Sequence, residues 1–216
     1  MEEASALKDT ADVLAVFAAR LHEGTILSAR RVSPENPDLA KGEKLLIFRR
    51  EVAGPSEWFN DGAYADNLNP DAVAAFIDIT YEAYRREVGQ EFGKAVPGIF
   101  TDEPNIYVGI GEVLRSGRRA LPWTDGLPDF FHERRGYDLL DVVPWLFYEG
   151  ERAPKARHDY WYTISQRFTE GYSKQIGEWC ERHGLAFTGH YLLENELGQG
   201  ILYGGAIMPH YRYQHV

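Results

Sequence analysis

The chain of 216 residues contains a single cysteine, Cys180, and no hydrophobic run near the ~20 residues of a membrane-spanning helix. One cysteine excludes an intramolecular disulfide and a metal site built from several thiolates. Basic residues are also few, with 23 Lys and Arg against 33 Asp and Glu and a net charge of −10. Because no basic stripe could bind phosphates, we expect neither a nucleic acid nor a membrane as a partner.

Other sequence signals are absent as well. The acidic start, Met1-Glu2-Glu3, has no signal-peptide core, which predicts a cytoplasmic protein. The chain has no Gly-x-Ser-x-Gly element for acyl transfer and no complete dinucleotide-binding glycine fingerprint. His210 and His215 have no evident third or fourth zinc ligand. We therefore expect no cofactor, and nothing in the sequence indicates a structural calcium ion.

Hydrophobic spacing predicts the local structure. Apolar residues at steps of three and four predict an amphipathic helix over 6–22. Two β-leaning runs follow, at 25–32 and 44–52, and they predict a β-hairpin-like insertion near residues 25–52. Asn69-Pro70-Asp71 then has the capping residue, proline and acid that begin a helix.

The later part of the chain alternates between helices and short apolar runs. The sequence predicts a helix from Asn69 to Gly89, a strand from Pro97 and a long loop over 105–128. It then predicts short helices at 129–135 and 138–147, a long helix at 156–183 and a strand at 185–193. This order favours a parallel α/β fold, and acids at strand ends are typical of (β/α)₈ TIM barrels. A complete barrel has roughly 250 residues. We therefore predict that residues 1–216 form a single partial-barrel catalytic segment, about half to two-thirds of an eightfold barrel.

Two glutamates follow predicted strands. Glu103 ends the strand that begins at Pro97, and Glu194 ends the strand that begins at Leu185. Glycoside hydrolysis needs one carboxylic acid to protonate the leaving group and one carboxylate to attack the sugar or activate water. Glu103 and Glu194 are therefore the candidate catalytic pair. The alternative is that both are solvated loop residues.

The candidate substrate-binding residues are Asp102, His190, Glu196, Trp58 and Tyr191. Asp102 and Glu196 are the neighbouring acids that could replace either glutamate. His190 lies within the last predicted strand, where it either binds a substrate hydroxyl or is a hydrogen-bonded core histidine. Aromatic side chains such as Trp58 and Tyr191 offer flat apolar faces to sugar rings. A metal-dependent hydrolase that uses Asp102, Glu103 and His190 is a further alternative.

Four segments carry a resemblance to a known family. They are Tyr64-Ala65-Asp66-Asn67-Leu68-Asn69-Pro70, Gly98-Ile99-Phe100-Thr101-Asp102-Glu103-Pro104, Arg135-Gly136-Tyr137-Asp138-Leu139 and Thr188-Gly189-His190. From about Lys44 to the carboxyl terminus, the chain resembles bacterial glycoside hydrolases of the barrel group related to α-L-rhamnosidases and family-2-like glycosidases.

The resemblance implies a (β/α)₈ domain that cleaves glycosidic bonds of plant or bacterial oligosaccharides and polysaccharides. By position it makes Glu103 and Glu194 catalytic, with His190 and Asp102 as supporting residues. It also implies a carbohydrate substrate and accessory β-sandwich domains that this chain lacks. A part-barrel would leave an open sheet edge, which favours self-association. The alternative function is a non-catalytic carbohydrate-binding remnant of such a barrel.

Overall fold

The computed structural model describes residues 11–107 and 117–216, without the side chain of Trp58. The chain divides into two compact units. One comprises residues up to 52 together with 126–160, and the other comprises residues 53–125 together with 161–216. Within the described ranges, no helix has the length and apolar character needed to cross a membrane.

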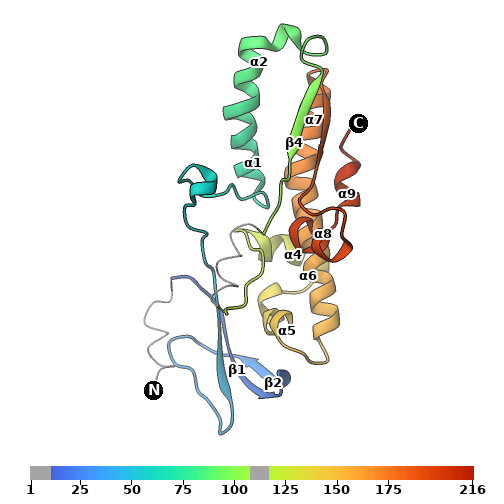
Figure 1. Cartoon of the computed structure of the whole chain (residues 1–216). Coiled ribbons are helices and arrows are strands. Elements are labelled where there is room, and N and C mark those ends of the chain that lie inside the picture. Colours follow the sequence, from blue (N-terminus) through green and yellow to red (C-terminus); the bar gives the residue numbers. More distant parts are fainter. Residues whose placement is uncertain (1–10, 108–116) are drawn as a thin grey trace. The chain divides into compact units, whose positions relative to one another are not determined.

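The first unit is built on a three-stranded antiparallel sheet. It contains β1 (Val13–His22), β2 (Thr25–Arg31), β3 (Lys44–Arg49), α4 (Leu127–Arg135), α5 (Val143–Phe147) and the start of α6 (Ala153–Phe168) (Figure 1). The strand order is β2-β1-β3. The two predicted β-leaning runs are therefore strands, but each pairs with β1 and not with the other. The predicted hairpin between them is wrong.

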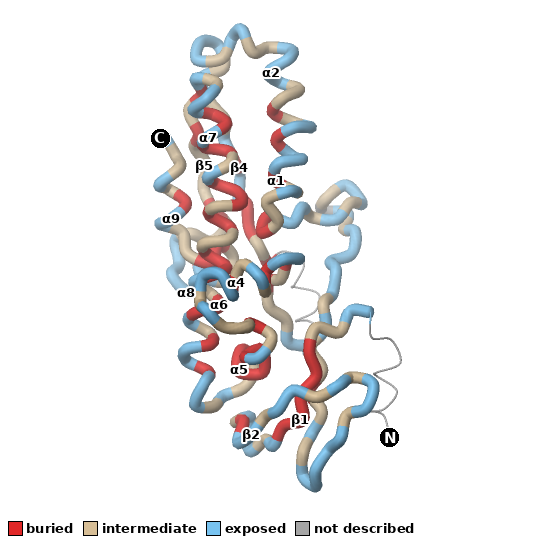
Figure 2. Tube along the Cα trace, turned by 180° about the vertical axis from the view of Figure 1, so that it is seen from behind, coloured by how far each residue is buried: buried red, intermediate tan, exposed pale blue. Residues whose placement is uncertain are grey.

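The described part of the predicted helix over 6–22 is instead the central strand β1; residues 6–10 lie outside the described part. Five consecutive residues, 15–19, are buried (Figure 2). A strand covered on both faces reads as a continuous apolar run, and in such a run helical spacing occurs by chance. The hairpin that does form joins β1 to β2 through Glu23 and Gly24, which both have positive φ, as two-residue hairpin turns require.

The second unit contains one pair of parallel strands. Its elements are α1 (Pro70–Phe76), α2 (Glu82–Val88), β4 (Gly98–Asp102), the end of α6, α7 (Gln175–Arg182), β5 (Ala186–His190), α8 (Leu197–Gly204) and α9 (Met208–Tyr211). β4 and β5 run in register from Gly98 opposite Ala186 to Asp102 opposite His190. Buried residues gather along α7, whereas β4 and β5 each have one buried residue, Thr101 and Phe187, and α2 is mostly exposed (Figure 2).

The predicted partial (β/α)₈ barrel is wrong. In the described residues the strands form one antiparallel sheet of three strands and one parallel pair, without the repeated alternation of strand and helix that builds a barrel. The local patterns identify β4, β5 and the helices between them. They do not specify which strands pair, because pairing is set by contacts far apart in the sequence. Of the predicted loop over 105–128, residues 108–116 lie outside the described part.

Two helix ends in the second unit, the start of α1 and the end of α7, lie where the sequence predicts them. Asn69 caps α1, with its side-chain oxygen accepting a hydrogen bond from the backbone N–H of Asp71 at 3.0 Å, which confirms the predicted helix start. α6, a π-helical turn at Thr169–Lys174 and α7 form the predicted long helix. It is followed by Gly184 with φ of +69°, as a C-terminal glycine requires.

Loss of the Asn69 cap is expected to weaken the second unit. Asn69→Ala removes the acceptor for the Asp71 N–H, and the free energy of unfolding should fall by about 1 kcal/mol. Asn69→Asp keeps a capping oxygen and is the matched control. Urea unfolding of both variants measures the effect, and equal midpoints would show that this cap contributes nothing.

Candidate functional site

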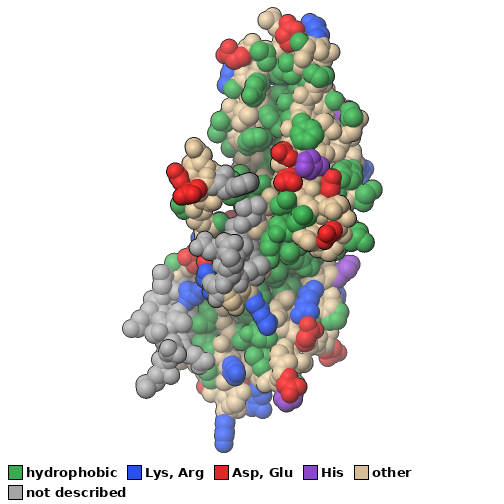
Figure 3. Space-filling view, viewed as in Figure 1, with side chains coloured by type: hydrophobic (Ala, Val, Ile, Leu, Met, Phe, Trp, Pro, Cys, Tyr) green, Lys and Arg blue, Asp and Glu red, His purple; other side chains and the backbone are tan. Residues whose placement is uncertain are grey.

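The carboxyl ends of β4 and β5 bring two predicted site residues together. Asp102 and His190 are opposite in the strand register, and His190 Nε2 lies 2.9 Å from Asp102 Oδ1. Both side chains are accessible, at 77% for Asp102 and 41% for His190. On this face of the molecule a histidine lies among acidic side chains (Figure 3). The pair can therefore offer hydrogen bonds to a ligand from solvent.

Glu103 continues directly from this pair. Its backbone N–H donates to the carbonyl oxygen of His190 at 3.1 Å, which extends the β4–β5 ladder by one bond. Its φ is +51°, a left-handed conformation that is uncommon for a residue with a Cβ. The residue is exposed. The structure thus places Glu103 beside Asp102 and His190, at the strand end where the sequence predicts it.

Glu194 does not lie directly at the end of a strand, where the sequence predicts it. β5 ends at His190, and Glu194 lies in the turn that follows, where its N–H donates to the Tyr191 carbonyl at 3.2 Å. Its Oε2 accepts hydrogen bonds from the Tyr191 N–H at 2.9 Å and from the Tyr211 hydroxyl at 2.6 Å. Burial and this carboxylate raise the pKa of Tyr211 to about 12, so the phenol remains a donor. Glu194 is thereby held in a fixed orientation.

The other candidate residues differ in their surroundings. Tyr191 is 1% exposed, and its hydroxyl lies 2.6 Å from Ser173 Oγ inside the second unit. Glu196 is exposed at the start of α8, where its Oε2 accepts from Gln199 Nε2 at 3.0 Å. Trp58 lies in the 3-10 turn Glu57–Phe59, and its side chain is outside the described part. Substrate contact by these three residues stays a prediction.

The sequence interpretation missed Phe100. This side chain is 61% exposed, and its ring centroid lies 5.8 Å from that of His190. Alternate residues of a strand share a face, so Phe100 belongs on the same face as Asp102. The two-residue spacing between Phe100 and Asp102 in the predicted strand could therefore have identified Phe100 as a candidate site residue. The resulting surface joins an apolar ring to polar groups, a combination that suits the mixed faces of a sugar.

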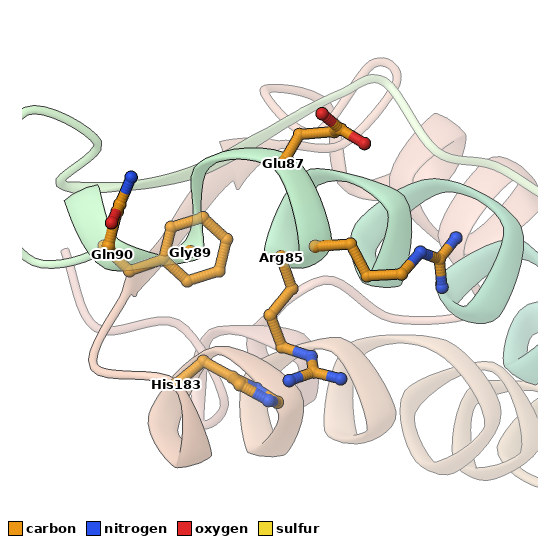
Figure 4. A pocket seen from close by; sticks show the side chains of 7 residues that line it. Arg85, Glu87, Gly89, Gln90 and His183 are labelled. Carbon is orange, nitrogen blue, oxygen red and sulfur yellow. The ribbon is translucent and has the colours of Figure 1, made fainter.

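A separate hollow of about 430 Å³ lies where α2 and α7 end (Figure 4). Its lining residues are Arg85, Arg86, Glu87, Gly89, Gln90, Phe92 and His183. Arg85 and His183 point toward one another across it. None of these lining residues is a predicted site residue. Among the described residues, moreover, no three His, Cys, Asp or Glu side chains form a group that could hold a metal ion.

Comparison with known proteins concerns the fold. No protein-family profile and no curated protein matches the sequence. The chain is similar to the solved structure of a rhamnosidase from Novosphingobium sp. PP1Y, with a TM-score of 0.51 and 16% sequence identity over 83% of this chain. The match covers 14% of the rhamnosidase, so this chain spans a small part of that enzyme's length. The chain is therefore similar in fold to a part of this rhamnosidase.

Proposed function

We propose that this chain is part of a glycoside hydrolase in which Glu103 is a catalytic carboxylate. The observation that carries the proposal is the cluster at the carboxyl ends of β4 and β5, where Glu103 directly follows the Asp102–His190 pair, whose Oδ1 and Nε2 atoms lie 2.9 Å apart. The similarity in fold to part of a rhamnosidase supports this class of reaction. Rhamnosides are therefore the first substrates to test.

The chemistry requires two carboxyl groups. In hydrolysis the glycosidic C–O bond breaks, the leaving oxygen takes a proton from a carboxylic acid, and water supplies the hydroxyl of the new reducing end. We assign Glu103 and Glu194 to these two carboxyl groups. Both described hydrogen bonds to the Glu194 carboxylate go to Oε2, which leaves Oε1 for the sugar or the water.

The neighbouring groups would bind the sugar. Asp102 accepts hydrogen bonds from hydroxyls, and the His190 ring can donate or accept beside it. The exposed ring of Phe100 would pack on the apolar face of the sugar ring. These contacts orient the glycosidic bond toward Glu103, which is where a positioned acid or base is effective.

Glu103→Gln tests the assignment. The amide keeps the size of the side chain but neither transfers a proton nor attacks, so turnover of aryl rhamnosides and other aryl glycosides should fall by about 10²- to 10⁴-fold. Glu181→Gln, at an exposed position of α7, is the matched control and should retain activity. Circular dichroism checks that both variants fold. Wild-type turnover in Glu103→Gln would overturn the role of Glu103.

Carbohydrate binding without cleavage is the second candidate function. It is favoured by the exposed Phe100 ring next to His190, since an aromatic platform with polar neighbours is sufficient to hold a sugar. Titration with rhamnose and other sugars, followed by NMR, separates the two functions. Binding that weakens in Phe100→Ala, together with the absence of turnover in the wild type, would establish binding alone.

A further inference from the structure

The backbone of Glu103 is in a conformation that needs support. Its φ of +51° lies in the left-handed region, where the Cβ of an L-residue crowds the backbone. Residues in such conformations persist when the surrounding structure holds them, and they are frequent at active sites. The exposed carboxylate has no hydrogen bond or ion pair described within residues 11–107 and 117–216. The backbone conformation therefore fixes the direction in which the side chain leaves the chain, and with it the region that the carboxylate can reach.

Both backbone polar groups of Glu103 are bonded. The N–H donates to His190, as described above, and the carbonyl oxygen accepts from Asn105 Nδ2 at 3.1 Å. The side-chain oxygen of Asn105 accepts from the N–H of Tyr107 at 3.2 Å. Asn105 therefore spans the turn after β4, with one end of its amide on Glu103 and the other on the chain beyond.

A second segment holds Asn105 itself. The carbonyl oxygen of Asn105 accepts from Asn67 Nδ2 at 2.9 Å, and its N–H donates to the Tyr64 hydroxyl at 3.3 Å. Asn67 Nδ2 also lies 3.3 Å from that hydroxyl. Asn105 is 3% exposed and Asn67 is 8% exposed, so the bond between them is buried, and the two bonds to Tyr64 are partly buried. Burial raises the pKa of Tyr64, which keeps its phenol neutral.

We propose that Tyr64, Asn67 and Asn105 form a clamp that holds Glu103 in its left-handed conformation and so aims its carboxylate. These three are positioning residues, because they act on Glu103 through its backbone. The clamp gives a role to Tyr64 and Asn67, two residues of the segment from Tyr64 to Pro70 that carries part of the family resemblance. The expected effect of the clamp on turnover rests on the proposed hydrolase function, whereas its expected effect on the backbone conformation of Glu103 does not.

The substitution Asn105→Asp tests the clamp, because it replaces only the side-chain NH2 group by an oxygen. Aspartate keeps an oxygen for the Tyr107 N–H, but it places an acceptor against the Glu103 carbonyl in place of the donor. We expect φ of Glu103 to leave the left-handed region and its amide to exchange faster with solvent. Crystallography and amide hydrogen exchange measure the two effects. Asn69→Asp is the matched control, since it adds the same charge and keeps its cap.

The kinetic expectation is a fall in kcat of about 10²-fold with KM changed by less than about threefold, because the carboxylate is misdirected while the sugar-binding groups remain. An unchanged φ of Glu103 in Asn105→Asp would overturn the clamp. A changed φ with unchanged kcat would overturn its role in positioning. If the wild type has no turnover on any glycoside, the hydrolase proposal fails, and the clamp is then decided by φ and exchange alone.

Discussion

Replacing Gly189 by alanine is expected to destabilise the second unit by at least about 3 kcal/mol. Gly189 lies in β5 opposite Thr101 of β4, and an added Cβ would lie 2.2 Å from the Thr101 carbonyl oxygen and 2.7 Å from its Oγ1. The φ of Gly189 is +146°, which other L-residues rarely adopt. The new methyl group would therefore force the two strands apart where Asp102 meets His190.

Gly198→Ala is the control for this substitution. Gly198 lies in α8, and an added Cβ there would meet no atom within 4 Å. Alanine should stabilise that helix by about 0.5–1 kcal/mol, because it loses less conformational freedom on folding. Urea unfolding of the two variants should shift the midpoint in opposite directions. A Gly189→Ala midpoint equal to that of the wild type would show that β4 and β5 separate at little cost.

Local signals in the sequence predict the elements around the site. The Pro97-Gly98 break followed by Ile99 and Phe100 predicts β4, and the acids after it lie at the strand end as expected. Asn69 and Gly184 mark a helix start and a helix end through side-chain capping and positive φ. These features depend on residues close together in the chain, which explains why a single sequence is sufficient to find them.

The errors have physical causes as well. Tyr191-Leu192-Leu193 continues the apolar run of β5, so the run predicts a strand up to Leu193. The strand ends three residues earlier because Leu193 has φ of +55° and the Glu194 carboxylate binds the Tyr191 N–H. The acid that the pattern places at a strand end is thus part of the turn that ends the strand. Periodicity does not predict such a side-chain interaction.

Nothing in the sequence around His210 distinguishes a buried histidine from a metal ligand or a surface residue. Within the second unit it is 0% exposed, between Ser173 Oγ at 2.7 Å from Nδ1 and the Gly204 carbonyl oxygen at 3.2 Å from Nε2. Since a carbonyl only accepts, we assign the ring proton to Nε2, and Nδ1 accepts from Ser173. The Tyr191 hydroxyl then donates to Ser173. Each donor in this chain has an acceptor while His210 is neutral.

Burial lowers the pKa of His210 to about 4, partly opposed by its hydrogen bond to Gly204. In the unfolded chain the same ring titrates near 6.5. Between these values the unfolded state binds the proton and the folded state does not, so stability falls as the pH decreases from about 6.5 to about 4. The contribution of His210 should decrease by about 2–3 kcal/mol between about pH 7 and about pH 4.5.

The difference between wild type and His210→Gln isolates this effect, because other titrating groups contribute nearly equally to both proteins. The wild type should lose its advantage over the variant as the solution is acidified. His132→Gln, at an exposed position of α4, is the matched control for replacing a histidine by glutamine. Urea unfolding at about half-unit pH steps measures the three curves. Parallel curves for the wild type and His210→Gln would mean that His210 takes up its proton in the folded state as readily as in the unfolded chain. The buried and fully hydrogen-bonded surroundings of the ring argue against that outcome.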